Sequence, residues 1–336
     1  MKNRINGTIE FYNKKTKDLI WDYPVSTNIY PVNWISANVG EITNKGFEVT
    51  INIDAIRTKD FNWMTTINLS HNKNKVNKLS NDKFEVGTYT QGDPMVAGVS
   101  SNGYTQRIME GESLGTFYTY KFAGYNDINV DGQTLKKSTY YVLDLEKHKK
   151  EDGTVKDDTF QDANGNWVTT APGFEDRAIT GCAQPKLNLG WNNTFNYKNF
   201  TASMFFTGVF GNKIYNGARA NYTSPEMFNN SKNVLKEFLT DRPATDNLPN
   251  YPSDRYLENG SYFRLQSLTL GYTFDKFDNW IQSLQLYATC NNVFTITGYK
   301  GLDPEVNLGG IDPGIDYRWS TYPHTRTFMV GAKINF

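Results

Sequence analysis

The sequence is poor in the features that mark several common protein classes. It holds only two cysteines in 336 residues, which excludes a disulfide-stapled scaffold. Its 35 basic and 35 acidic side chains cancel, so the charge gives no support for nucleic-acid binding. No apolar run approaches the ~18 residues of a transmembrane helix. The first residues, MKNRINGTIEFYNKK, lack the apolar region of a signal peptide. Taken alone, these absences describe an ordinary soluble chain.

The sequence is rich in aromatic residues and in strict alternation. Aromatics make up 15% of the chain, which argues against disorder. Between Phe47 and Ala55 every second residue is apolar, and the residues between them, such as Glu48 and Asn52, are polar. A strand points successive side chains to opposite faces, so this pattern predicts a strand with one apolar and one polar face. The same pattern predicts about ten strands, at residues 5–11, 47–55, 61–69, 101–109, 118–122, 187–197, 200–210, 268–274, 284–294 and 328–336. The segment at 101–109 has the weakest pattern.

The links between these segments alternate between short and long. The short links are residues 56–60, 110–115, 198–199 and 275–283, and the long ones are 16–38, 73–100, 126–185, 211–260 and 295–325. In an up-and-down meander this order gathers the long loops at one end, as in outer-membrane barrels. We therefore predict an all-β fold, an antiparallel transmembrane β-barrel with an apolar face to lipid and a polar face to a wet lumen. The alternative is a soluble β-sheet with one solvated face.

Six stretches of the chain resemble the SusC/RagA family of TonB-linked outer-membrane proteins, and their order and spacing agree with that family. They are NVGEITNKGFEVTINIDAIRTKDFNWMTTINLSHNKNKV (38–76), GESLGTFYTYKFAGY (111–125), QPKLNLGWNNTFNYKNFTASMFFTGVFGNKIYN (184–216), DRYLENGSYFRLQSLTLGYTF (254–274), NNVFTITGYKGLDPEV (291–306) and YPHTRTFMVGAKINF (322–336). The family barrel has roughly 22 strands around a plug. The resemblance thus implies that residues 1–336 are about the last ten strands of such a barrel, a C-terminal fragment without the plug and N-terminal domains.

The resemblance also implies a function and a set of partners. Family members import oligosaccharides or peptides across the outer membrane of Gram-negative bacteria. A SusD-like lipoprotein covers their extracellular loops, and the TonB–ExbB–ExbD complex acts on the N-terminal part that is missing here. The remaining partner is outer-membrane lipid, and nucleic acid is not expected. Two alternatives stay open: a self-contained small outer-membrane porin, and a soluble β-sheet carbohydrate-binding module.

No set of residues suggests catalysis. The three histidines, His71, His148 and His324, lie far apart in the sequence, and none has a partner at metal-ligand spacing. We therefore expect no enzyme activity and no catalytic residue. Aromatic residues with polar neighbours in the long loops can stack on sugars, and the candidates are Trp167, Tyr299, Tyr317 and Trp319. The competing interpretation for these four is an interfacial aromatic girdle or packing within the loops.

One short motif is similar to the start of a calcium loop. Asp127, Asn129 and Asp131 precede Gly132 in the order D-x-N-x-D-G, but the twelfth position is Ser138 where a bidentate Glu is needed. A second and less complete version is DANGNW at residues 162–167. A hydrophilic turn explains both stretches as well. We therefore expect no cofactor, and Asp127, Asn129 and Asp131 are the candidate ligands if calcium binds.

Overall fold

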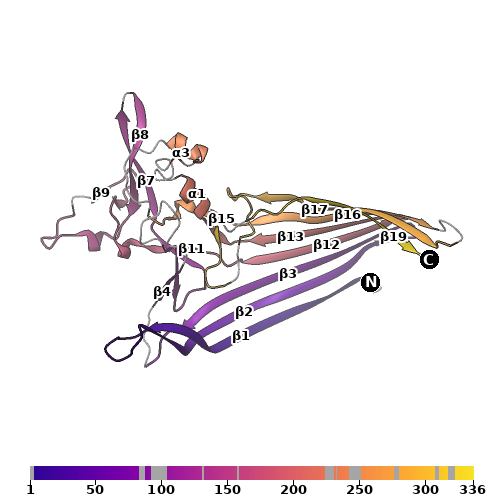
Figure 1. Ribbon diagram of the computed structural model, residues 1–336, viewed down its shortest axis with the longest axis horizontal. Coiled ribbons are helices and arrows are strands. Elements are labelled where there is room, and N and C mark those ends of the chain that lie inside the picture. The colour runs from indigo at the N-terminus through magenta and orange to yellow at the C-terminus, as the bar shows by residue number, and fades with distance from the viewer. Residues whose placement is uncertain are drawn as a thin grey trace.

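The computed structural model describes residues 4–82, 88–91, 104–130, 132–156, 159–223, 231, 233–241, 251–275, 280–306, 310–316 and 322–336. Within them the chain forms one long sheet of eight strands (Figure 1). At one end of this sheet lies a part made of loops, short strands and short helices, which we name the loop part. Both chain ends lie at the opposite end of the sheet.

The eight long strands form an antiparallel meander in which each strand pairs with its neighbour along the chain. In order across the sheet they are β1 (Ile5–Pro24), β2 (Trp34–Arg57), β3 (Phe61–Lys78), β12 (Leu187–Tyr197), β13 (Phe200–Phe210), β16 (Tyr262–Asp275), β17 (Ser283–Thr297) and β19 (Thr327–Asn335). Their antiparallel arrangement confirms the predicted fold class.

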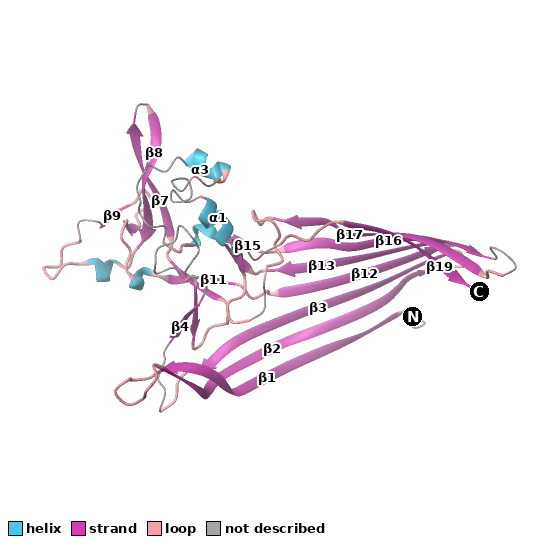
Figure 2. Cartoon of the chain, viewed as in Figure 1, coloured by secondary structure: helices cyan, strands magenta, loops and turns pink. Residues whose placement is uncertain are grey.

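Short and long links alternate along this meander, as predicted. The short links are residues 58–60, 198–199 and 276–282, and the longer ones are 25–33, 79–186, 211–261 and 298–326. The longer links lie at the end that carries the loop part (Figure 2). The first of them is much shorter than the predicted 16–38, because β1 and β2 continue for 20 and 24 residues. Both strands are about twice the length that a tilted strand needs to cross a bilayer.

Two of the ten predicted barrel strands lie elsewhere. The predicted strands at 101–109 and 118–122 correspond to β5 (Gln106–Met109) and β6 (Thr116–Thr119), four residues each. They belong to a small sheet of the loop part with β11 (Ala178–Cys182) and β4 (Thr88–Gln91). Such segments are too short to cross a bilayer, and β3 pairs directly with β12 instead. These two predicted strands form one up-and-down pair. Taking the pair out of the predicted meander does not change the alternation of short and long links.

The strand register turns the sequence alternation into two rows of opposite chemistry. One row crosses the sheet as Ile51, Ile67, Trp191, Phe206, Leu265 and Phe294, each the partner of the next. The adjacent row is polar except at Phe205 and runs Asn6, Asn52, Thr66, Asn192, Phe205, Ser267, Asn291 and Thr327. Asn52 Nδ2 donates to Asn6 Oδ1 at 3.0 Å, and Thr66 Oγ1 donates to Asn52 Oδ1 at 2.8 Å. One face of the sheet is therefore apolar, and the other is a hydrogen-bonded polar surface, which we name the polar face.

The apolar face contains one polar pair that the alternation does not predict. Thr65 and Asn193 are partners in the register and are 8% and 3% exposed. The indole Nε1 of Trp63 donates to Asn193 Oδ1 at 3.1 Å, and that of Trp191 donates to Thr65 Oγ1 at 2.8 Å. The two polar side chains therefore satisfy indole N–H groups that an apolar environment would leave unpaired.

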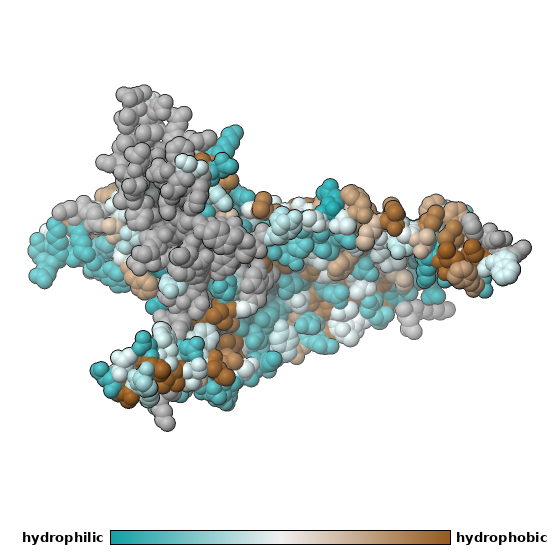
Figure 3. Space-filling model, in the orientation of Figure 1, coloured by the Kyte–Doolittle hydropathy of each residue, from teal (hydrophilic) through white to brown (hydrophobic). Residues whose placement is uncertain are grey.

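Exposed apolar side chains are spread over the apolar face, for example Ile9, Phe11 and Leu270 at 66%, 80% and 53%, and two groups add to them. Phe328, Val330 and Phe336 are 75%, 88% and 82% exposed on the last strand. A second group, which includes Ile29 and Trp34, lies at the tip of the β1–β2 hairpin. Figure 3 shows apolar surface at both places and hydrophilic surface along the sheet between them. A water-soluble sheet does not normally leave so much apolar surface uncovered.

The loop part has two further sheets and its own core. One sheet contains β7 (Phe122–Val130), β8 (Gln133–Val142), β10 (Trp167–Thr169) and β9 (Thr159–Gln161), and the other contains β15 (Leu257–Asn259), β14 (Lys213–Asn216) and β18 (Ile315–Asp316). Its helical segments are η1 (Leu145–His148), η2 (Phe174–Asp176), α1 (Gly217–Tyr222), α3 (Lys236–Asp241) and η3 (Asp254–Tyr256). Its core includes Phe117, Tyr215, Tyr256 and Ile315.

Among the described residues, the helices are all too short and too polar to cross a bilayer.

Candidate functional site

A polar hollow of about 510 Å³ lies near the end of the sheet that carries the long loops. It is lined by Gln266, Asn291, Asn292, Tyr322, Pro323, His324, Thr325 and Thr327. Asn291 and Thr327 belong to the polar row, so the hollow lies on the polar face. A volume of this size is within the ~300–1,000 Å³ range of small-molecule sites.

A cluster of charged side chains, which we name the Arg264 cluster, adjoins this hollow. It consists of Arg264 on β16, Asp303 and Glu305 on the loop after β17, and His324 just before β19. The Arg264 guanidinium is 1% exposed and donates to Asp303 Oδ1 at 2.6 Å and to Glu305 Oε2 at 2.7 Å. It also donates to Thr295 Oγ1 at 2.9 Å. The cluster therefore holds the last long loop against the sheet.

The charges of this cluster are largely balanced within it. His324 Nδ1 lies 3.0 Å from Asp303 Oδ2, and the backbone N–H groups of Glu305 and His324 donate to the same carboxylate. Burial alone would raise the pKa of Asp303, but these hydrogen bonds and that from Arg264 together hold it below its usual value. Asp303, Glu305 and His324 also have the spacing of metal ligands. The guanidinium already supplies their counter-charge, which argues against a metal ion there.

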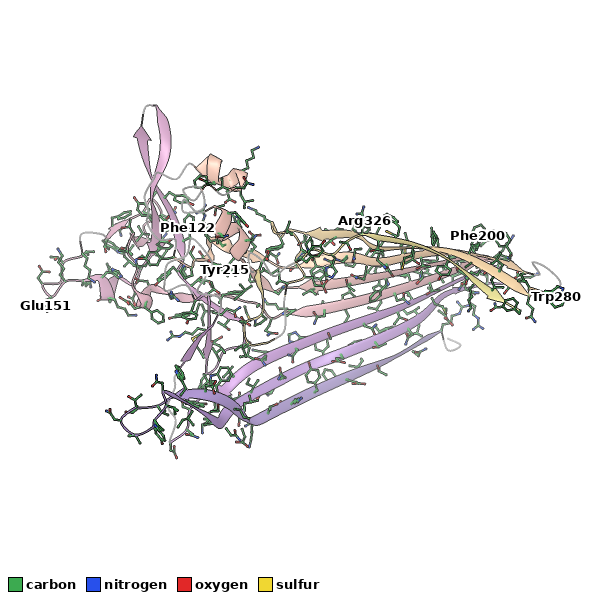
Figure 4. The ribbon with its side chains drawn as sticks, viewed as in Figure 1. Phe122, Glu151, Phe200, Tyr215, Trp280 and Arg326 are labelled. Atoms are coloured by element: carbon green, nitrogen blue, oxygen red, sulfur yellow. The ribbon has the colours of Figure 1, made fainter. Side chains whose placement is uncertain are left out.

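Cationic and aromatic side chains stack in the loop part. The Arg177 guanidinium lies 4.9 Å from the Tyr120 ring centre, and the Arg255 guanidinium lies 4.9 Å from that of Tyr125. Tyr215 is fully buried, and burial raises the pKa of its hydroxyl. Figure 4 places Tyr215 in the loop part and Trp280 at the opposite end of the sheet. This stacking stabilises the loops above the sheet.

A buried histidine and a buried aspartate also pair in the loop part. His148 Nε2 lies 2.7 Å from Asp176 Oδ2, and both side chains are almost fully buried. The Asp176 carboxylate also accepts the backbone N–H groups of Asp144 and Gly173. Glu175 lies close enough to complete a metal-ligand spacing with them. Two backbone donors on one carboxylate favour a structural pair that joins η1 to η2.

The predicted aromatic binders do not form one site among the described residues. Trp167 is half-buried in β10. Tyr299 is 6% exposed, packs with Ile214 and Val306, and donates its hydroxyl to Asp316 Oδ2 at 2.5 Å. This burial favours the packing interpretation for Tyr299. Tyr317 and Trp319 lie outside the described residues. A ligand-binding role for these four residues stays a prediction.

The structure leaves the calcium motif untested. Asp131 lies outside the described residues, and the side chains of Asp127 and Asn129, whose backbones belong to β7, are not described. In the second motif the Asp162 carboxylate accepts the backbone N–H groups of Asn164 and Asn166, and Asn166 Nδ2 donates to its other oxygen. That carboxylate closes its own turn, which favours the hydrophilic-turn interpretation there.

The lining of the polar hollow was not among the predicted site residues. Its residues come from segments up to 61 positions apart, 266 and 327, so no local motif announces them. One signal was present: Asn292 interrupts the apolar positions Leu284, Leu286, Ala288, Cys290 and Phe294. A polar residue at an expected apolar position of a strand indicates a bulge or a site.

The known proteins that are similar in sequence to the chain are TonB-dependent receptors. No protein-family model matches the chain. Over 99% of its length it is 30% identical to the TonB-dependent receptor P3 of Formosa agariphila, and over its full length it is 29% identical to the TonB-dependent receptor SusC of Bacteroides thetaiotaomicron. The chain is similar along its whole length to the SusC/RagA family of TonB-dependent receptors. The family places it in the outer membrane, as predicted.

The chain spans about a third of its relatives' length, 32% of receptor P3 and 30% of SusC. Solved structures agree on the fold. The RagAB peptide transporter superposes with a TM-score of 0.72 over 99% of the chain, at 21% identity and over 34% of the transporter chain. The eight-stranded sheet therefore has the fold of one section of a transmembrane β-barrel.

Proposed function

We propose that the chain forms the C-terminal part of the barrel of an outer-membrane transporter that takes up oligosaccharides or peptides. One observation carries the proposal: a row from Asn6 to Thr327, polar on every strand except β13, where it holds Phe205, backs an apolar row across the same sheet. A wall of this kind separates lipid from a water-filled passage. The relatives are named as receptors, which supports a role in binding and transport.

Within such a transporter the loop part faces the outside of the cell. Its stacked arginine and aromatic side chains form a firm surface on which a SusD-like lipoprotein rests as a lid. The TonB–ExbB–ExbD complex acts through the N-terminal part of the longer receptor. The polar face lines the passage, and no bond of the nutrient is broken, so the protein is not an enzyme.

The two alternatives have less support. In a small self-contained porin the first and last strands pair to close the barrel. Here the described strand order ends at β1 on one side and β19 on the other. A soluble module does not leave Val330 and Phe336 more than 80% exposed on one strand without a cover.

An in-frame deletion of the segment that encodes residues 1–336, made in the bacterium that carries the gene, tests the proposal. We expect loss of growth on one oligomeric nutrient and normal growth on its monomer, which is small enough for porins. The nutrients are a panel of neutral oligosaccharides, acidic oligosaccharides and peptides. Dissipating the proton-motive force should abolish uptake in the parent strain. Equal growth of both strains on every oligomer, or recovery of the protein in the soluble fraction, would refute the proposal.

A further inference from the structure

We propose that the polar hollow beside the Arg264 cluster is a binding subsite for a neutral saccharide. The inference rests on the proposed transport function and narrows its substrate from two classes to one. It also assigns the binding to residues that the sequence did not indicate, chiefly Gln266, Asn291, Asn292 and Tyr322.

The lining has the chemistry of a hydroxyl-binding surface. Three carboxamides, those of Gln266, Asn291 and Asn292, lie on neighbouring strands, and Thr325 and Thr327 add hydroxyl groups. A carboxamide both donates and accepts hydrogen bonds, as a sugar hydroxyl does. Tyr322 is 82% exposed at this lining, so its ring is free to pack on the C–H face of a pyranose.

A bulge brings these amides together. The register between β16 and β17 shifts between Leu265 and Ser267, and Asn292 on the opposite strand adopts a φ of 53°. A positive φ is uncommon for a residue other than glycine, and such positions concentrate at functional sites. Bulges redirect side chains next to binding sites. The strained backbone therefore supports a functional role for this point of the sheet.

One buried acceptor of the lining remains unsatisfied. Asn292 Nδ2 donates to the backbone oxygen of Thr325 at 2.8 Å, but the buried Asn292 Oδ1 accepts no hydrogen bond in the described part of the chain. A buried polar atom without a partner is rare in a folded protein and calls for a missing partner. The atom has almost no accessible surface, so a ligand hydroxyl pairs with it only after the Asn292 side chain rotates toward the hollow.

The charges around the hollow argue against a peptide. No Lys, Arg, Asp or Glu is among its described lining residues. Of the cations close to it, Arg264 already binds Asp303 and Glu305, and Arg326 donates to the backbone oxygens of Asn292 and Val293. His324 faces the same two carboxylates as Arg264. A peptide brings charged termini and side chains, which need free partners of opposite sign when desolvated. A neutral saccharide needs none.

Calorimetry on the full-length receptor in detergent tests this inference. The probes are neutral hexasaccharides of glucose, xylose and mannose, an oligogalacturonate and a mixture of short peptides. We expect a neutral hexasaccharide to bind, and Tyr322→Ala and Gln266→Ala each to weaken it by about tenfold or more, the loss expected for one direct contact. Gln285→Ala, a glutamine on the same face near the short links, and Tyr30→Ala, an exposed loop tyrosine, are the matched controls and should change the Kd by less than about twofold.

The outcomes separate this inference from the proposed function. Saccharide binding that Tyr322→Ala and Gln266→Ala leave unchanged would refute the subsite. Binding and uptake of peptides alone would refute the saccharide while the transport function stands. Loss of no nutrient in the deletion strain, together with no binding in the calorimeter, would refute both. Because Tyr322 and Gln266 are not buried, both variants should fold, and their heat-modifiable migration in gels confirms it.

Discussion

Replacing Arg264 with methionine should open the last long loop of the receptor. Methionine keeps most of the length of the side chain but removes its charge and its donors. Asp303, which is 5% exposed, then stays buried beside Glu305 without its main counter-charge. Breaking a buried ion pair by removing one partner costs about 3–5 kcal/mol. Because the carboxylates belong to a loop and the arginine to a strand, the cost falls on the closure of the loop.

Hydrogen exchange of individual amides measures this opening directly. The N–H groups of Glu305 and His324 both donate to the Asp303 carboxylate, so their protection reports whether that carboxylate is in place. A loss of 3–5 kcal/mol corresponds to exchange that is faster by about 100- to 3,000-fold, since each 1.4 kcal/mol is a factor of ten. Amides at the centre of β12 and β13 should exchange at unchanged rates.

Two variants control this experiment. Arg326→Met removes an exposed arginine that donates only to backbone oxygens of Asn292 and Val293, and it should leave the protection of Glu305 within about threefold of the parent. Arg264→Met combined with Asp303→Asn should recover part of the protection, because the buried charge is then gone. If Arg264→Met leaves both reporter amides protected, the Arg264 cluster does not hold the loop and the reasoning is wrong.

Three further predictions follow from the structure. Hydrogen bonds lower the pKa of Asp303 in the folded protein, so its contribution to stability is complete above the unfolded pKa of about 4. This contribution disappears as the pH falls through the lower folded pKa. Acid titration of the protection of the Glu305 amide should show the loss, and Asp303→Asn should remove this pH dependence. Gly115→Ala should lower the stability more than Gly111→Ala does. Both glycines have positive φ, but a Cβ added at Gly115 lies 2.6 Å from Pro313 Cγ, whereas the space at Gly111 is open. Thermal unfolding of the two variants measures the difference. The 336-residue chain alone should not refold into a compact, heat-modifiable species in detergent, because β1 and β19 each lack a second partner in the described sheet; such a species on a gel would contradict this.

The alternation of the sequence predicted the wall of the barrel well. The apolar residues Ile51 and Ile67 were assigned to one face by their spacing alone, and the register makes them partners. This success has a physical reason: lipid on one side and water on the other impose the same period on every residue of a strand. The order of short and long links was also predicted, because in a meander the positions of the strands determine which links lie at which end.

The loops could not be predicted in the same way. The segment at 118–122 alternates as a barrel strand does, and the segment at 101–109 does so only weakly. The partners of β5 and β6 are other loop segments, and only the tertiary structure decides that. Tyr299 was a candidate for ligand stacking because it is aromatic and lies among polar residues, yet its ring is in the core. The Arg264 cluster joins Arg264 to residues 39 to 60 positions further along the chain, and no local pattern connects them.

The bulge at Gln266 explains how the sheet keeps both faces intact while it holds a site. From Leu268 to Phe274 the apolar side chains take even numbers, whereas before the bulge Phe263 and Leu265 are apolar at odd numbers. The extra residue reverses the phase, so Leu265 stays on the apolar face and Arg264 moves to the polar one. Without this reversal the arginine would face lipid, where a charge costs ~2–4 kcal/mol. A change of apolar phase inside a strand is visible in the sequence, and in this receptor it marks the point where the wall becomes a candidate binding surface.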